Sequence, residues 1–528
     1  MNCMKKLIYI LLTGFLLSCI KDQSVMVYPV NNPNFSMITI TSPTEKLSVD
    51  YGQEFTFTPV VTQKITGKEL KYIWTTNFIQ SGVIGDIVKI GEGATLKYSF
   101  PKYGTYQLRL EVKNEDYSAF KTWEIAVRVY DAGYFVVAND DTGNSNIAFA
   151  RTLSQTDILE GKQLTFISDL INKVNPGMGI KNVVRVVKST ITYNRTDAYI
   201  HIFTKDKIYI ADQNTFKIFN VVNFADKYPG EFITKVSSFD TYLTATALFT
   251  SKGRLVGYQK PEFLIYRYDN WGDTFFSDVY VNLIYTSGAN VNGGEALVDY
   301  ENSKIWMSIN YHNSNLPVNN TSGVNASQNN FGDNYRVNIY QNMNILSVFR
   351  MNGATNGGTP YNLFALAQDR TNPLKIKFVE FTTTTSGGIG TITENNYTAT
   401  SPITFRKGME MIPNARYNTV YYADGNKIYS WYLRNTAPNN QLPNNPVITL
   451  AAGKVITTVS VSYDMKELYV GYYDQNSSNA LKGGFCIYSC AEIGLNQNIV
   501  PTKNFENITT RPVQILYKSV GWDKPVSF

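Results

Sequence analysis

Two histidines are the first residues to consider for acid–base or metal chemistry. The sequence around His201, AYIHIFT, alternates like a β-strand, so we expect a hydrogen-bonded structural histidine there. His312, in NYHNSN, falls on an expected loop, where its imidazole is more available to a ligand. Neither histidine belongs to an HExxH or other spaced metal motif, and the sequence has no GxSxG nucleophile elbow. We therefore expect no catalytic residue, no metal and no cofactor.

Two cysteines near the C-terminus are the next candidates. In FCIYSC, Cys486 and Cys490 lie four positions apart in a strand-like segment. An extended backbone separates their Cα atoms too far for a disulfide. No neighbouring histidine or cysteine completes a zinc site. The pattern predicts two buried free thiols.

Acidic residues offer carboxylate pairs and one oxygen-rich segment. A fold can pair carboxylates such as Asp140, Asp141, Asp269 and Asp273 as glycosidases require, but almost any chain of this length offers such pairs. The stretch NDDTGNSN, residues 139–146, has the oxygen-rich alternation of a calcium loop. It lacks the terminal glutamate of an EF-hand, so a hairpin turn is the better interpretation.

A long amide-rich segment, residues 310–334, is hard to explain as scaffold alone. Its sequence, NYHNSNLPVNNTSGVNASQNNFGDN, supplies many hydrogen-bonding groups, with flat surfaces from Tyr311, His312 and Phe331. Connections of this length within compact domains tend to be functional. Trp271, in YDNWGDTFF, lies between turn residues and is expected to be exposed. We predict that these four side chains bind sugar rings or peptides; contact with another protein, or simple solvation, is the alternative.

The N-terminus predicts export. Two lysines precede the apolar run Leu7–Leu17, and Ser18 stands directly before Cys19. Because the run is too short to span roughly 30 Å of hydrocarbon as a helix, residues 1–18 are expected to be a cleaved signal peptide. The sequence LLSC resembles a bacterial lipobox, which implies acylation (palmitate) of Cys19 and anchoring to a membrane. A plain secretory signal with a chance cysteine is the alternative.

The residues after Cys19 bear on location. Ile20, rather than aspartate, follows the cysteine, which argues against retention in the inner membrane. Lys21 and Asp22 resemble the short charged signal that sends some lipoproteins to the cell exterior. We expect a lipid-anchored outer-membrane protein that faces outward, with residues 19–36 as a tether.

Composition favours an all-β extracellular protein. Charged residues make up only 17% of the chain, while aromatic residues reach 14%, and β-branched and aromatic residues favour strands. The formal net charge of +6 is too small and too dispersed to indicate nucleic-acid binding. No apolar run after the signal reaches membrane length.

Short alternating segments predict a β-sandwich over residues 37–130. Trp123 and Ile125, for example, share one face of a strand. The YIW of Tyr72–Trp74 and the YGTYQLRLEV of Tyr103–Val112 resemble a PKD domain, which implies an immunoglobulin-like sandwich. The DFGDG that usually follows the tryptophan is absent, as in divergent PKD-like lipoproteins. Trp74 is expected in the core rather than on a ligand platform.

A loose repeat follows over residues 131–528. IYIADQNTFKIFN (208–220) and VYYADGNKIYSWY (420–432) each place Ala-Asp and an Asn-containing turn between two strands, and YFVVANDDTGNSNIAF (134–149) is a longer copy. Strand centres are expected near residues 136, 209, 256, 306, 364, 421 and 469. A helix-like insert, residues 157–174, accounts for the widest interval.

Seven such units predict a seven-bladed β-propeller. The C-terminal PVQILYKSV is expected to pair with the first blade and close the ring, which removes exposed sheet edges. Eight blades, or a pair of sandwiches, are the alternatives.

The lipobox, the PKD-like unit and the propeller together resemble the PKD-like family lipoproteins of Gram-negative bacteria. This resemblance implies a non-catalytic accessory subunit of a nutrient importer, in which a SusC-like TonB-dependent barrel is capped by a SusD-like lipoprotein. The ligand would be a peptide or a glycan, and no nucleic acid is expected. Two rivals remain: a propeller glycoside hydrolase or polysaccharide lyase, and a surface adhesin.

Overall fold

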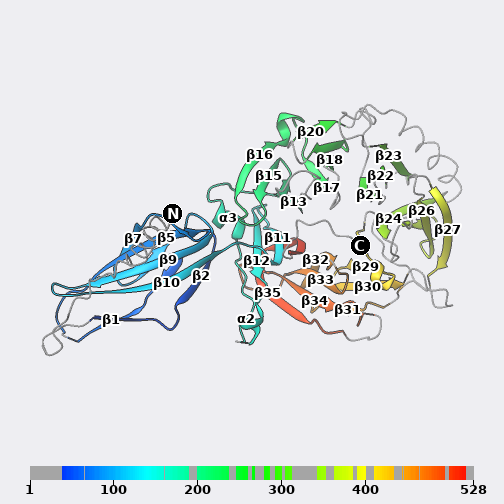
Figure 1. The fold of residues 1–528 in the computed structure, drawn as a ribbon. Coiled ribbons are helices and arrows are strands. Elements are labelled where there is room, and N and C mark those ends of the chain that lie inside the picture. Colours follow the sequence, from blue (N-terminus) through cyan, green and yellow to red (C-terminus); the bar gives the residue numbers. More distant parts are fainter. Residues whose placement is uncertain are drawn as a thin grey trace, which may run out of the picture. The chain divides into compact units, whose positions relative to one another are not determined.

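The computed structural model describes the following residues: 38–64, 66–159, 161–188, 199–236, 245–259, 264–267, 279–285, 292–299, 304–311, 342–351, 362–383, 389–399, 409–432, 443, 445–462, 464–493 and 499–518. Within these ranges the chain is almost entirely β-structure and divides into two compact units (Figure 1). The first contains residues 38–49 and 54–128. The second contains Asp50–Gln53 and the described residues from Val129 onward. No helix in the described ranges is long and apolar enough to cross a membrane.

The first unit is a β-sandwich. One sheet has the order β2-β10-β9-β5-β6, with β7 also paired to β5, and the pairs β1–β4 and β3–β8 complete the unit. Its strands are β1 (Ile38–Thr41), β2 (Lys46–Asp50), β3 (Phe55–Phe57), β4 (Val60–Gln63), β5 (Lys71–Gln80), β6 (Val83–Ile84), β7 (Val88–Glu92), β8 (Leu96–Tyr98), β9 (Gly104–Lys113) and β10 (Ser118–Arg128).

Two tryptophans form the centre of this sandwich. The Trp74 side chain is fully buried, its Nε1 donates to the Gly93 carbonyl at 2.9 Å, and its ring centroid lies 5.9 Å from that of Trp123. The core interpretation of Trp74 is therefore confirmed. Gly104 opens β9 with φ +127°, and a Cβ there would lie 2.8 Å from the Phe78 ring. Only glycine accommodates both the backbone angle and this close approach.

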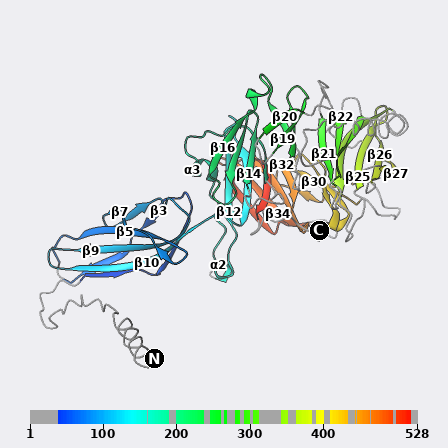
Figure 2. The ribbon, with the colours of Figure 1, turned by 45° about the horizontal axis from the view of Figure 1, so that its top comes forward.

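The second unit is a β-propeller of seven described sheets arranged around a ring (Figures 1 and 2). Blade 1 contains β11 (Gly133–Asn139), β12 (Ser145–Arg151) and β36 (Arg511–Lys518). Blade 2 contains β13 (Val183–Lys188), β14 (Tyr199–Thr204), β15 (Lys207–Asp212) and β16 (Ile218–Asn223). Blade 3 contains β17 (Ile233–Val236), β18 (Ala245–Thr250), β19 (Leu255–Gln259) and β20 (Leu264–Arg267).

The remaining blades follow in chain order. Blade 4 contains β21 (Val279–Tyr285), β22 (Asn292–Asp299) and β23 (Lys304–Tyr311). Blade 5 contains β24 (Met343–Met351), β25 (Asn362–Asp369), β26 (Lys375–Thr383) and β27 (Ile389–Thr398). Blade 6 contains β28 (Ile412–Asn414), β29 (Thr419–Asp424), β30 (Lys427–Tyr432) and β31 (Ile448–Thr449). Blade 7 contains β32 (Lys454–Val461), β33 (Glu467–Asp474), β34 (Gly483–Ser489) and β35 (Lys503–Thr509).

The hydrophobic cores of the ring lie between neighbouring blades. One cluster joins blades 1 and 2, and others join blades 2 and 3, 5 and 6, 6 and 7, and 7 and 1. A middle strand is therefore covered on both faces, which explains continuous apolar runs such as β14, YIHIFT, where five of the six residues are buried. All seven predicted strand centres lie in strands of different blades: β11, β15, β19, β23, β25, β29 and β33.

The recurring motif does not occupy equivalent positions in the blades. Counted outward from the ring interior, the predicted centres fall on the third strand of blades 2–4 and on the second strand of blades 1 and 5–7. Accordingly, residues 208–220 form an outer hairpin, β15–β16, whereas residues 420–432 form a middle hairpin, β29–β30. The uneven spacing thus reflects a change in which strand carries the motif.

The insert after blade 1 corrects one expectation. Instead of one helix, it forms α2 (Gln155–Leu159) and α3 (Leu170–Val174), and the described 3₁₀ turns elsewhere are η1 (Phe224–Asp226) and η4 (Ala415–Tyr417). The left-handed Gly161, at φ +69°, follows α2, and Ile167 then pairs with Phe149 as a β-bridge. These features divide the helical pattern in two.

Candidate functional site

Most of the side chains predicted to bind a ligand lie outside the described residues. These are Trp271, His312 and Phe331, and the predicted lipidation site Cys19 also lies outside. Tyr311 is described only in its backbone, as the last residue of β23. The carboxylates Asp269 and Asp273 lie outside as well. The predicted grouping of these side chains stays a prediction.

The register of blade 4 places Val279 and Tyr311 at opposite ends of its sheet. Val279 pairs with Asp299, which also pairs with Lys304. Tyr311 pairs with Asn292 at the other end.

The core histidine and the two thiols are structural. His201 is fully buried in β14, and its Nδ1 lies 3.1 Å from the hydroxyl of Tyr258 in blade 3. Cys486 and Cys490 are buried free thiols, as expected. Burial raises the pKa of each thiol to about 11, so little reactive thiolate exists near neutral pH. Among the described residues no group of His, Cys, Asp or Glu has the arrangement of a metal site.

The oxygen-rich segment 139–146 is the hairpin turn between β11 and β12. One Asp140 oxygen, Oδ1, accepts from the backbone and hydroxyl of Thr142 and from the Asn144 backbone N–H. Its other oxygen accepts from Asn144 Nδ2 at 3.0 Å. The Asp140 carboxylate therefore stabilises the turn by accepting these hydrogen bonds.

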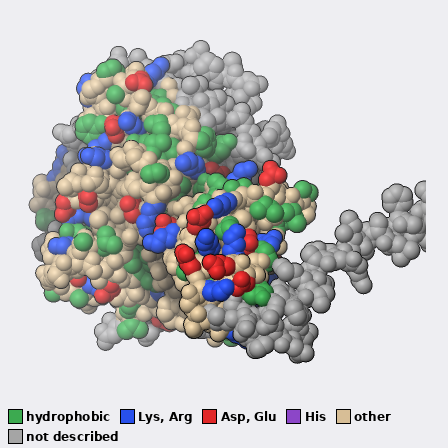
Figure 3. Space-filling model, turned by 90° about the vertical axis from the view of Figure 1, so that its left-hand side faces the viewer, with side chains coloured by type: hydrophobic (Ala, Val, Ile, Leu, Met, Phe, Trp, Pro, Cys, Tyr) green, Lys and Arg blue, Asp and Glu red, His purple; other side chains and the backbone are tan. Residues whose placement is uncertain are grey.

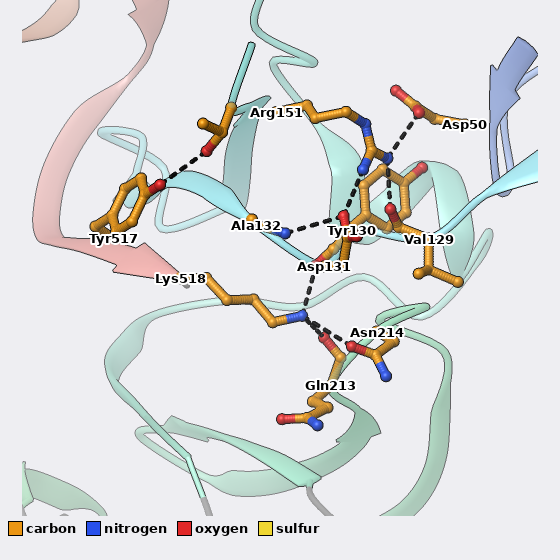
Figure 4. Close-up of polar contacts among 11 residues, drawn as sticks. Asp50, Val129, Tyr130, Asp131, Ala132, Arg151, Gln213, Asn214, Tyr517 and Lys518 are labelled. Carbon is orange, nitrogen blue, oxygen red and sulfur yellow. Dashed lines mark hydrogen bonds and ion pairs between the residues drawn. The ribbon is translucent and has the colours of Figure 1, made fainter. Parts of the chain in front are cut away.

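Hydrogen bonds of polar side chains stabilise the place where blade 1 closes the ring. The C-terminal strand β36 pairs with β11 from Gly133↔Lys518 to Asn139↔Arg511, which confirms the expected closure. Lys518, only 2% exposed, donates from Nζ to the carbonyls of Tyr130 at 2.5 Å and Gln213 at 2.6 Å, and to Asn214 Oδ1 at 3.2 Å (Figure 4). A buried ammonium is stable only with such partners.

Arg151 forms a second set of stabilising contacts at the ring closure. Its guanidinium contacts the Asp131 carboxylate at 2.6 Å, the Asp50 carboxylate at 2.8 Å and the Val129 carbonyl at 2.5 Å (Figure 4). Nearby, the hydroxyls of Thr152 and Tyr517 lie 3.0 Å apart. These contacts hold β12 to the entering chain at the point where β36 ends.

A side-chain amide links β36 to blade 2. Gln514 Nε2 donates to the Val186 carbonyl at 3.1 Å, and Gln514 Oε1 accepts from the Val186 N–H at 2.8 Å. Through these two bonds the side-chain amide of Gln514 pairs with the Val186 backbone as a neighbouring strand would. They join β36 to β13, the inner strands of adjacent blades. The backbone beside Arg185 is therefore fixed.

The innermost strand of each blade lines the ring interior, and in blade 1 this strand is β36. Contacts join β36 to β13, β13 to β17, β21 to β24, β24 to β28, β28 to β32 and β32 to β36.

Two opposite charges lie on or next to these inner strands. Glu410 precedes β28 and is exposed, whereas its neighbours Met409 and Met411 are buried in the core between blades 5 and 6. Arg185 is partly exposed on β13. Although Glu410 is accessible, the surrounding protein desolvates it and raises the pKa of its carboxyl, while the positive charge of Arg185 opposes the shift.

Sequence reasoning missed both charges, although a signal was present. Each is a lone charge in an apolar stretch, Glu410 in GMEMIP and Arg185 in VVRVVK. Charged residues are rarely placed in such surroundings without a partner or a function.

On the described surface shown in Figure 3, charges of both signs are mixed. Figure 3 shows acidic and basic side chains interspersed over the described surface that faces the viewer. A continuous basic face, which nucleic-acid binding requires, is absent from that view.

Comparison with known proteins supports the assignment of the first unit. Residues 39–127 match the PKD domain family. No curated protein matches this sequence.

Several solved structures share parts of the arrangement. A quinonprotein alcohol dehydrogenase-like protein from Bacteroides thetaiotaomicron is 16% identical, with 90% of this chain and 97% of that chain covered and a TM-score of 0.47. The WD40 repeats of RRP9 are 8% identical, with 62% and 83% covered and a TM-score of 0.31. The fission yeast complex of SREBP and SCAP binding domains gives 9% identity, 68% and 87% covered, and a TM-score of 0.35. These scores are too low to carry an argument, so the strand pairing of this chain itself defines the propeller.

Proposed function

We propose that this chain is an outer-membrane lipoprotein, anchored through Cys19 and facing the cell exterior. In this proposal it is a non-catalytic accessory subunit of a SusC/SusD-type nutrient importer and helps to bind oligopeptides or glycans. The PKD domain serves as a spacer or docking module, and the propeller recognises the ligand.

The observation that supports the binding role is the presence of accessible charges at the inner strands of the closed ring. Arg185 is partly exposed on β13, and Glu410 is exposed directly before β28. Gln514 holds the backbone of Val186, next to Arg185, through two hydrogen bonds. Polar groups held on rigid elements are suited to ligand recognition. The lipobox resemblance and the PKD match support the placement of this module on a cell surface.

Affinity purification of the tagged full chain from native outer membranes tests the importer role. We expect a TonB-dependent barrel and a SusD-like lipoprotein to co-purify. A Cys19→Ala variant tests the anchor, because it should leave the membrane fraction. A reproducibly solitary wild-type protein would contradict the accessory role.

One observation favours a second candidate, the glycoside hydrolase. A carboxyl whose pKa is raised by desolvation is suited to act as a general acid, and Glu410 has this property. A glycosidase also needs a second carboxyl group at a defined separation. Release of reducing sugars from polysaccharide by the wild type, abolished in Glu410→Gln, would favour this candidate over the binding role.

A further inference from the structure

One stretch of the sandwich unit concentrates exposed apolar side chains. Within six consecutive residues, four large apolar side chains are 53–69% exposed: Val83, Ile84, Ile87 and Val88. They lie on β6, on β7 and in the link between these two strands. A single exposed apolar residue is ordinary, whereas a contiguous exposed apolar patch marks a place of interaction.

The same stretch is an edge of the larger sheet. Val88 pairs with Thr76 of β5. The Gly85 N–H donates to the Phe78 carbonyl of the same strand at 2.8 Å. On the side away from β5, residues 83–89 form no backbone hydrogen bond with another described strand, and Figure 1 shows β7 at the border of the sheet. This side, the outer edge, therefore presents backbone N–H and C=O groups among apolar side chains.

The backbone groups of the outer edge select among possible occupants. A hydrocarbon surface would cover the apolar side chains but leave the N–H and C=O groups without partners, which is strongly unfavourable. An extended protein strand satisfies both, because its backbone continues the hydrogen-bonded ladder while its side chains pack beside the exposed ones.

Charge distinguishes a different protein from a second copy of this chain. Lys89 pairs with Glu92, whereas Asp86 forms no ion pair with another described residue. The uncompensated charge of the outer edge is thus negative, and a second copy would bring the same negative charge to it. A strand with a basic side chain opposite Asp86 supplies the complement.

We propose that the outer edge, residues 83–89, binds an extended strand of a partner protein that carries β-branched apolar residues and a basic residue opposite Asp86. Only the identity of this partner, a subunit of the importer, rests on the proposed function. The binding of a strand rests on the pairing, exposure and charge of the sandwich unit itself.

Calorimetric titration of the purified full chain in detergent tests the binding of a strand with the peptide acetyl-SEVTKTVVS-amide. Aligned antiparallel to the outer edge, this peptide places a lysine opposite Asp86 and valines opposite Ile84 and Val88. A second peptide has N-methyl groups on its central residues, which removes the donors of the ladder. A third has glutamate in place of the lysine. We expect the second and third peptides to bind about tenfold or more weakly than the first.

Variants of the chain locate the binding. Ile87→Asp places a charge among the apolar side chains and should weaken binding of the first peptide by about tenfold or more. Ile158→Asp makes the same change at an exposed isoleucine of α2 and should leave binding unchanged. Asp86→Lys should weaken binding of the lysine peptide and strengthen binding of the glutamate peptide. Circular dichroism of every variant checks that the β-structure is retained.

Several results would overturn the proposal. The first is no binding of the lysine peptide, and the second is binding that is indifferent to Ile87→Asp or to N-methylation. Dimerisation in sedimentation that Ile87→Asp abolishes would make a second copy the occupant instead. Flotation of the Cys19→Ala chain with phosphatidylcholine vesicles, if lost when Ile87→Asp is added, would make a lipid surface the occupant.

Purification from native outer membranes separates this proposal from the accessory role. We expect Ile87→Asp to lose the barrel and the lid, and Ile158→Asp to retain them. If Ile87→Asp retains both, the outer edge does not dock the importer and the accessory role stands. If the wild type is recovered alone, the accessory role fails, and the peptide titration still decides whether the outer edge binds a strand.

Discussion

Charged side chains are used in opposite ways at two places in the propeller. At the ring closure, Lys518 and Arg151 are surrounded by backbone carbonyls and carboxylates within hydrogen-bonding distance. At the inner strands, Arg185 is partly exposed on β13 and Glu410 is exposed directly before β28. The first arrangement stabilises the fold, whereas the second leaves charged groups accessible to solvent. Substitutions at the two places should therefore have different consequences.

The largest effect is expected at Lys518. Replacing it with methionine keeps much of its volume but leaves two buried carbonyls and the Asn214 side chain without their donor. We expect the free energy of unfolding of the propeller to fall by about 3–5 kcal/mol. Urea denaturation followed by tryptophan fluorescence measures this loss. Lys427→Met, at an exposed position of β30, is the control and should change stability little.

Arg151 should give the next largest effect. Arg151→Met breaks contacts to Asp131, Asp50 and the Val129 carbonyl at a partly buried site. We expect a loss of about 2–3 kcal/mol in the same urea measurement. Asp131, half exposed, should matter less, so Asp131→Asn is expected to cost about 1 kcal/mol or less. Equal losses for the two variants would contradict the assigned contacts.

Gln514 tests the link between closure and interior. Gln514→Leu removes both hydrogen bonds to the Val186 backbone and should lower the free energy of unfolding by about 1–2 kcal/mol. The same urea measurement checks this loss. An unchanged free energy of unfolding would contradict the assigned link between β36 and β13.

The smallest effect on stability is expected at Glu410, and its sign depends on pH. A carboxyl whose pKa is higher in the folded than in the unfolded state binds more protons when folded. Its contribution to stability is therefore lost as pH rises from the unfolded pKa through the raised folded pKa. Glu410→Gln lacks this loss, so its stability relative to wild type should increase as pH rises from 4 to 8. A constant difference across this range would exclude the desolvated carboxyl.

The sequence predicted the architecture well because the architecture depends on local patterns. Strands such as β14 and β33 are packed between blades, and their apolar runs mark the blades even where the motif shifts from one strand to another. Trp74 was predicted as a core residue of the sandwich, and His201 as a hydrogen-bonded structural residue of a strand; both side chains are buried.

The charged contacts were beyond such reasoning. Lys518 meets Tyr130 and Gln213 only because β36 returns to blade 1, more than 300 residues along the chain. Arg185 lies in blade 2 and Glu410 directly before blade 6, and only the closed ring brings these parts of the chain into one unit. Each appears in the sequence as a single charge in an apolar stretch, which indicates a special position but not its partner. The predicted ligand side chains Trp271, His312 and Phe331 lie outside the described residues, so their role stays a prediction.

The most direct test of the proposed function is affinity purification of the tagged full chain from native outer membranes. The proposal predicts that a TonB-dependent barrel and a SusD-like lipoprotein co-purify with the wild-type chain. A wild-type protein that is reproducibly recovered alone would contradict it.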